Sequence, residues 1–70
     1  MLSGNIKNIF NVYNHFEKII SKKELLNYYI PILGQREISS IIIFFENLKI
    51  IKIENEILIK EYLYISNSRL

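Results

Sequence analysis

The residues best suited to chemistry are the polar side chains along one side of a helix predicted at 35–49. Arg, Ser and Asn side chains hydrogen-bond the edges of base pairs, and an aliphatic side chain contacts the methyl group of thymine. We therefore predict that this side of the helix binds DNA. Its members are Arg36, Ser39, Ser40, Ile43 and Asn47. The alternative interpretation is an ordinary solvated helix face, or a protein contact in which Ile43 and Phe44 take part.

Four lysines are candidates for contacts to the phosphate backbone. Lys22 and Lys23 begin a predicted helix, where free backbone amides and the helix dipole favour an anion. Lys52 and Lys60 are expected on the outer face of a predicted β-hairpin, beside a DNA groove. The alternative is that these lysines keep the protein in solution and protect an edge strand from aggregation.

The sequence carries no pattern typical of an enzyme or a metal site. It has no cysteine, and Ile19 occupies the position four residues after the single histidine, His15, where a second ligand would stand. The glutamates are scattered over different predicted elements, and no glycine-rich phosphate loop is present. We predict a protein without catalytic activity, metal or cofactor.

Length and composition indicate one small domain. A chain of 70 residues buries only about 60% of its surface on folding, which suffices for a single core. We expect one domain over 1–70, with a frayed tail at 66–70. The longest apolar run, Ile41 to Phe45, is far shorter than the roughly 20 residues that span a bilayer. We therefore expect a soluble protein, cytoplasmic or otherwise intracellular, without a membrane partner.

The first predicted helix covers 5–20 and is strongly amphipathic. Its apolar residues recur at spacings of three and four: Ile6, Ile9, Tyr13, Phe16 and Ile20. Phe10, Val12 and Ile19 widen the apolar arc beyond what a core-facing helix needs. We predict that the surplus forms a homodimer interface containing Val12 and Ile19.

Two further helices follow. Ser21 and Glu24 form a capping box that starts the second helix near Lys22, and Pro31 is expected to end it by Ile30. A turn at 31–34 then leads to the third helix, with Gly34 free to adopt a positive φ. The third helix has an apolar side that comprises Ile38, Ile41, Ile42, Phe45 and Leu48.

A hairpin is predicted after the third helix. The segments 50–54 and 57–63 are rich in β-branched and aromatic residues, and 54–56 separates them. A three-residue turn would pair Ile53 with Ile57, and Ile51 with Ile59, on the core face. Two later tyrosines, Tyr62 and Tyr64, are expected to complete the core.

Three helices followed by a two-stranded wing make a mainly α fold with a small hairpin, which is the order of a winged helix-turn-helix domain. The segment GQREISSIIIFFENLKIIKIE resembles the recognition helix and wing of that family, with Lys49 where the family usually has Gly. The resemblance implies double-stranded DNA as partner and a small transcription regulator as function. The alternatives are a protein-interaction winged helix in a larger assembly, or a replication or plasmid-maintenance factor that binds DNA.

Overall fold

The computed structural model describes residues 2–61, which form three helices and a three-stranded antiparallel sheet. In chain order the elements are α1 (Leu2–Tyr13), β1 (Ile19–Ser21), α2 (Lys22–Leu33), α3 (Gln35–Asn47), β2 (Ile51–Glu54) and β3 (Ile57–Lys60). The strand order is β1-β3-β2, so the last strand lies in the middle of the sheet. Within the described part of the chain, no helix is long and apolar enough to cross a membrane.

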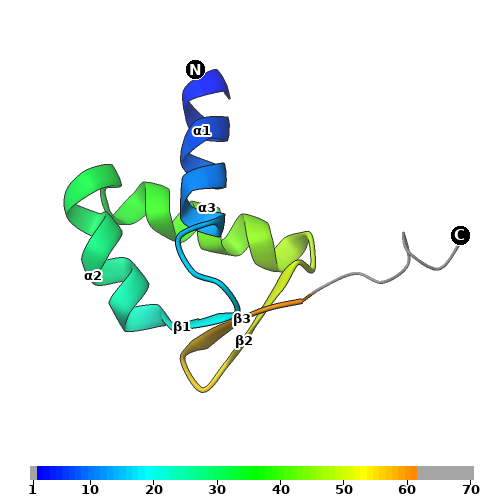
Figure 1. Ribbon diagram of the computed structural model, residues 1–70. Coiled ribbons are helices and arrows are strands. Elements are labelled where there is room, and N and C mark those ends of the chain that lie inside the picture. The colour runs from blue at the N-terminus through cyan, green and yellow to red at the C-terminus, as the bar shows by residue number, and fades with distance from the viewer. Residues whose placement is uncertain (1, 62–70) are drawn as a thin grey trace, which may run out of the picture.

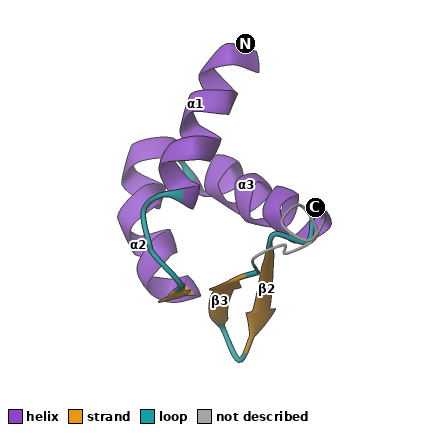
Figure 2. Cartoon of the chain, turned by 45° about the vertical axis from the view of Figure 1, so that its right-hand side comes forward, coloured by secondary structure: helices purple, strands orange, loops and turns teal. Residues whose placement is uncertain are grey.

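The three helices lie together above the sheet, and the β2–β3 hairpin extends from one end of them (Figures 1 and 2). The N-terminal half of α1 projects beyond the other elements in both views. The side-chain amide of Asn8 in α1 donates a hydrogen bond to the carboxylate of Glu37 in α3 over 3.0 Å. This bond links the two helices.

The first helix is shorter than predicted, and a strand that was not predicted follows it. Helix α1 ends at Tyr13, and Ile19 and Ile20 lie in β1 rather than on the helix. β1 pairs with β3, and the bond from the Lys60 amide to the Lys18 carbonyl, 2.8 Å, extends the ladder. The reason is that β-branched residues suit a strand, and β3 offers an edge that would otherwise lack hydrogen bonds.

The second helix begins as predicted and ends later than predicted. The Ser21 hydroxyl accepts from the Glu24 amide over 3.0 Å, which is the first of the two capping-box bonds. Pro31 lies inside the last turn of α2 instead of ending the helix. Proline lacks an amide and so leaves the Asn27 carbonyl without a helical partner, but both residues are exposed and water can replace the bond.

A single residue joins α2 to α3. Gly34 has φ of 94°, as its place between two helices predicted. Its amide donates to the Ile30 carbonyl over 2.8 Å, and its carbonyl accepts from Ile38 over 3.1 Å. The predicted turn at 31–34 is therefore reduced to Gly34, and α3 starts at Gln35 as expected.

The hairpin register differs by one residue from the prediction. Ile53 pairs with Leu58, and Glu54 pairs with Ile57, across a two-residue turn. The turn residues Asn55 and Glu56 both have positive φ, 51° and 64°, which is typical of a type I′ turn. Because a shift of one residue exchanges the two faces of a strand, Leu58 is buried instead of Ile57 and Ile59.

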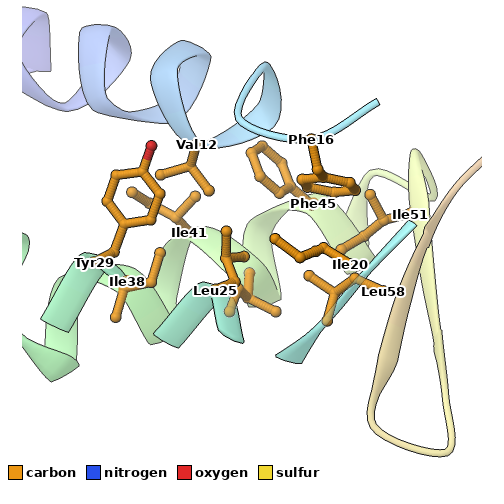
Figure 3. Packing of buried hydrophobic residues seen from close by; sticks show 11 residues of the cluster. Val12, Phe16, Ile20, Leu25, Tyr29, Ile38, Ile41, Phe45, Ile51 and Leu58 are labelled. Atoms are coloured by element: carbon orange, nitrogen blue, oxygen red, sulfur yellow. The ribbon is translucent and has the colours of Figure 1, made fainter. Parts of the chain in front are cut away.

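One core joins all six elements (Figure 3). Its buried residues are Val12, Phe16, Ile20, Leu25, Tyr29, Ile38, Ile41, Ile42, Phe45, Ile51 and Leu58. The predicted buried side of α3 is confirmed except at Leu48, which is exposed. Val12 was predicted at a dimer interface, and this is wrong because its side chain has no exposed surface. The predictions for Tyr62, Tyr64 and the tail at 66–70 lie outside the described residues.

Candidate nucleic-acid interface

The polar face predicted on the third helix is present and open to solvent. Arg36, Ser40, Ile43 and Asn47 are exposed and Ser39 is half-buried. We call these five residues the outer face of α3. They point away from the buried side of the helix because residues three and four apart stack on one side of a helix. From Arg36 to Asn47 the face runs along three helical turns, about 16 Å.

The charge of the outer face is low. Arg36 is its only ionised side chain, and Glu37 and Glu46 stand beside it on the same helix. Glu37 is half-buried and accepts the bond from Asn8, so its carboxylate is directed toward α1. The face therefore offers hydrogen-bond donors and acceptors around one cation, with the exposed Ile43 among them.

The start of α2 is less open to an anion than the sequence suggested. The Lys22 amide donates to the Glu56 carbonyl over 2.8 Å, and the Glu24 amide is capped by Ser21. These bonds use two of the amides that a phosphate would need. Lys22 is half-buried and Lys23 is exposed, so the lysine side chains remain the available donors at this end.

The two hairpin lysines do not share a face. Lys52 pairs with Ile59 on the outer face and lies 3.8 Å from the carboxylate of Glu54. Lys60 pairs with Ile51 on the core side. Its ammonium donates to the Phe16 carbonyl over 2.7 Å, so the expectation that Lys60 flanks a groove on the outer face is wrong.

Lys49, where the winged-helix pattern usually has Gly, is a further basic residue just after α3. It follows the last turn of α3, is exposed and has φ of 63°. Glycine adopts this conformation freely, which gives a physical reason for glycine at the same place in the family pattern. With lysine there, the chain gains a cation at the C-terminal end of the outer face.

The single histidine and the buried Tyr29 form local packing contacts. His15 lies beside Tyr28 and Tyr29, with ring centroids 4.6 and 5.2 Å away. The Tyr29 hydroxyl donates to the Asn11 carbonyl over 3.3 Å, and burial, helped by the neighbouring Tyr28, raises the pKa of Tyr29. Among the described residues, no three His, Cys, Asp or Glu side chains are placed to hold a metal ion.

Comparisons with known proteins give no further guide to this surface. No family model, no curated protein and no solved structure matches the chain.

Proposed function

We propose that the chain is a winged helix-turn-helix domain that binds double-stranded DNA as a small transcription regulator, with α3 as its recognition helix. The order of elements supports the fold, because three helices precede the β2–β3 hairpin and Gly34 alone separates α2 from α3. The added strand β1 pairs with β3 and leaves this order unchanged.

The observation that carries the proposal is the exposed polar stripe on α3. A helix enters the major groove of DNA with one side toward the base edges, and the outer face of α3 is free along about 16 Å for this purpose. Arginine reads guanine and asparagine reads adenine through paired hydrogen bonds. In this arrangement Arg36 and Asn47 read bases near the two ends of the helix, and Ile43 between them contacts a thymine methyl group.

The lysines divide into those that support this arrangement and those that do not. Lys23 and Lys49 are exposed near the ends of α2 and α3 and are suited to phosphates on either side of the groove. The hairpin carries Glu54 and Glu56 at its turn, and two carboxylates are repelled by phosphate. The hairpin turn therefore points away from the duplex in the proposed complex.

A protein partner is the second candidate, and Ile43 favours it. This side chain is 55% exposed at the centre of the outer face, where only Arg36 supplies charge. An exposed aliphatic residue inside a polar rim is also the pattern of a protein interface. DNA and a protein partner would bind the same outer face of α3. One pair of variants therefore distinguishes the two proposals.

That pair is Ser40→Glu on the outer face and Asn14→Glu on the turn after α1, which change the net charge equally. We expect Ser40→Glu to abolish binding to duplex DNA, because its carboxylate would face the groove. Asn14→Glu is expected to weaken binding only slightly. Equal losses in a gel-shift titration would show that the outer face of α3 does not contact DNA. Absence of any shift by the wild type would favour the protein partner.

Variants of Arg36 and Lys23 distinguish contacts to base edges from contacts to phosphates. Arg36→Ala is expected to weaken specific binding by about 1–3 kcal/mol and to relax the preference at one base position. Lys23→Ala is expected to weaken binding to all sequences alike and to flatten the salt dependence. An equal loss on specific and random duplexes for Arg36→Ala would identify Arg36 as a phosphate contact instead.

A further inference from the structure

An apolar groove lies between α1 and the C-terminal half of α3. It has a volume of about 370 Å³, and apolar and aromatic side chains line it throughout. Its rim consists of Ile6 and Phe10 on α1 and of Phe44 and Leu48 on α3 and its C-cap. We call this surface the apolar groove.

The four rim residues are large apolar side chains that are exposed to solvent. Phe10 is 62% exposed, Ile6 53%, Leu48 51% and Phe44 44%. Ile6 and Leu48 belong to the apolar patterns that predicted buried faces of their helices. The largest contiguous apolar patch on a small protein, typically several hundred Å², is often a functional surface.

We infer that the apolar groove is the interface of a homodimer, in which each copy covers the groove of the other. The available area supports a second copy. Since a fully exposed phenylalanine presents roughly 200 Å², Phe10 and Phe44 together expose about 200 Å². Ile6 and Leu48 add a similar amount, for roughly 400 Å² per copy. A standard interface takes roughly 800 Å² from each partner, about 65% or roughly 520 Å² of it apolar in homodimers, so the groove supplies about half of the total area and about three quarters of the apolar area.

A two-fold dimer needs a projecting part and a recess on the same copy. The N-terminal half of α1 projects from the body as a ridge (Figure 1). Ile6 belongs to this half, and Phe10 follows one turn later in the other half of the helix. The groove beside this ridge has more than twice the roughly 150 Å³ that accommodates a benzene molecule. A two-fold axis therefore allows Phe10 of each copy to enter the groove of its partner. A two-fold interface requires the same patch on both copies to be complementary to itself, and the ridge beside a groove meets that requirement.

The apolar groove and the outer face of α3 share no residue. Arg36, Ile43 and Asn47 do not line the groove. The two surfaces adjoin, because the rim residue Phe44 also lines a second pocket together with Arg36 and Ser40. The inference rests on the groove residues and does not require the outer face to bind DNA. It also replaces the predicted interface at Val12 and Ile19, because Val12 is buried in the core and the exposed Ile19 does not line the groove.

The test is the oligomeric state of the full chain by sedimentation equilibrium between about 1 and 100 μM, a range that brackets ordinary dimer affinities. We expect the wild type to be a dimer. Phe10→Glu and Leu48→Glu are each expected to raise the dimer dissociation constant at least tenfold, with the helical circular dichroism unchanged because both side chains are exposed. Ile32→Glu is the matched control, since Ile32 is 59% exposed on α2 and does not line the groove. It should leave the dimer intact.

Two results would overturn the inference. One is a wild type that stays monomeric throughout this range. Another is a dimer that resists Phe10→Glu but dissociates on Ile19→Glu, which would place the interface at the exposed residue of β1. If the wild type is monomeric, the residues after Glu61 are the alternative occupant to test, because the Glu61 amide bonds the carbonyl of the groove residue Ile50. If Leu63→Ser with Ile65→Ser destabilises a monomeric wild type, the chain covers its own groove.

Discussion

The ammonium of Lys60 lies 4.1 Å from the ring centroid of Tyr13, and this contact joins the last strand to the last turn of α1. The same ammonium lies 4.9 Å from the ring centroid of Phe16, whose carbonyl it also bonds. A lysine that the sequence suggested for DNA thus stabilises the segment where α1 ends. Burial lowers the pKa of Lys60, and the nearby Glu17 opposes this shift.

This lowered pKa predicts a pH dependence of stability. As the pH rises from neutrality toward the ordinary value of 10.5, the folded chain loses the Lys60 proton before the unfolded chain does. The unfolded state then binds more protons, so the free energy of unfolding rises with pH in this window. Lys60→Met should remove this contribution. Urea denaturation of the wild type and of Lys60→Met between pH 7 and 10 measures the free energy of unfolding of each. The same pH dependence in both proteins would contradict the prediction.

The hairpin register predicts that alanine substitutions at Leu58 and Ile57 lower the free energy of unfolding by different amounts. Leu58→Ala is expected to cost about 2–5 kcal/mol of unfolding free energy, because the fully buried side chain leaves a cavity. Ile57→Ala removes a half-buried side chain and should cost clearly less. Denaturant titration of the two variants decides between the registers. A larger loss for Ile57→Ala would favour the three-residue turn that the sequence suggested.

The positive φ at the hairpin turn predicts that glycine stabilises the protein. Glu56 has φ of 64°, and a left-handed conformation costs roughly 1 kcal/mol in a residue with a Cβ atom. Glu56→Gly also creates the Asn-Gly pair that type I′ turns prefer. The variant should therefore melt at a higher temperature. Glu54→Gly, in the extended strand β2, is the control and should melt lower than the wild type.

The sequence predicted a helix correctly where the spacing of its apolar residues fitted only a helix. Ile38, Ile41, Ile42 and Phe45 fit only a helix, and this fixed both the buried side of α3 and its outer face. Ile20 was ambiguous, because it fits the helical spacing of α1 and also suits a strand. Only the pairing with β3, nearly forty residues later in the chain, decides for the strand.

The parts of the site that could not be predicted depend on how elements lie against one another. The turn at Asn55 lacks the glycine that indicates a type I′ turn, so the sequence did not reveal which face of the hairpin Lys60 occupies. The apolar groove likewise requires the crossing of α1 over α3, which no local pattern specifies. The helical periodicity of α1 placed Phe10 on an apolar face wider than the core needs. It could not show that Leu48 lines the same groove.

The most direct test of the proposed function is the affinity of the purified protein for a duplex selected from a random pool, compared with a scrambled duplex of equal length. Fluorescence anisotropy at about 0.15 M salt measures both, since weaker screening inflates non-specific binding. We predict that the selected duplex binds at least roughly 10³-fold more tightly. Equal affinities for the two duplexes, or a pool from which no sequence is enriched, would contradict recognition of DNA by the outer face of α3.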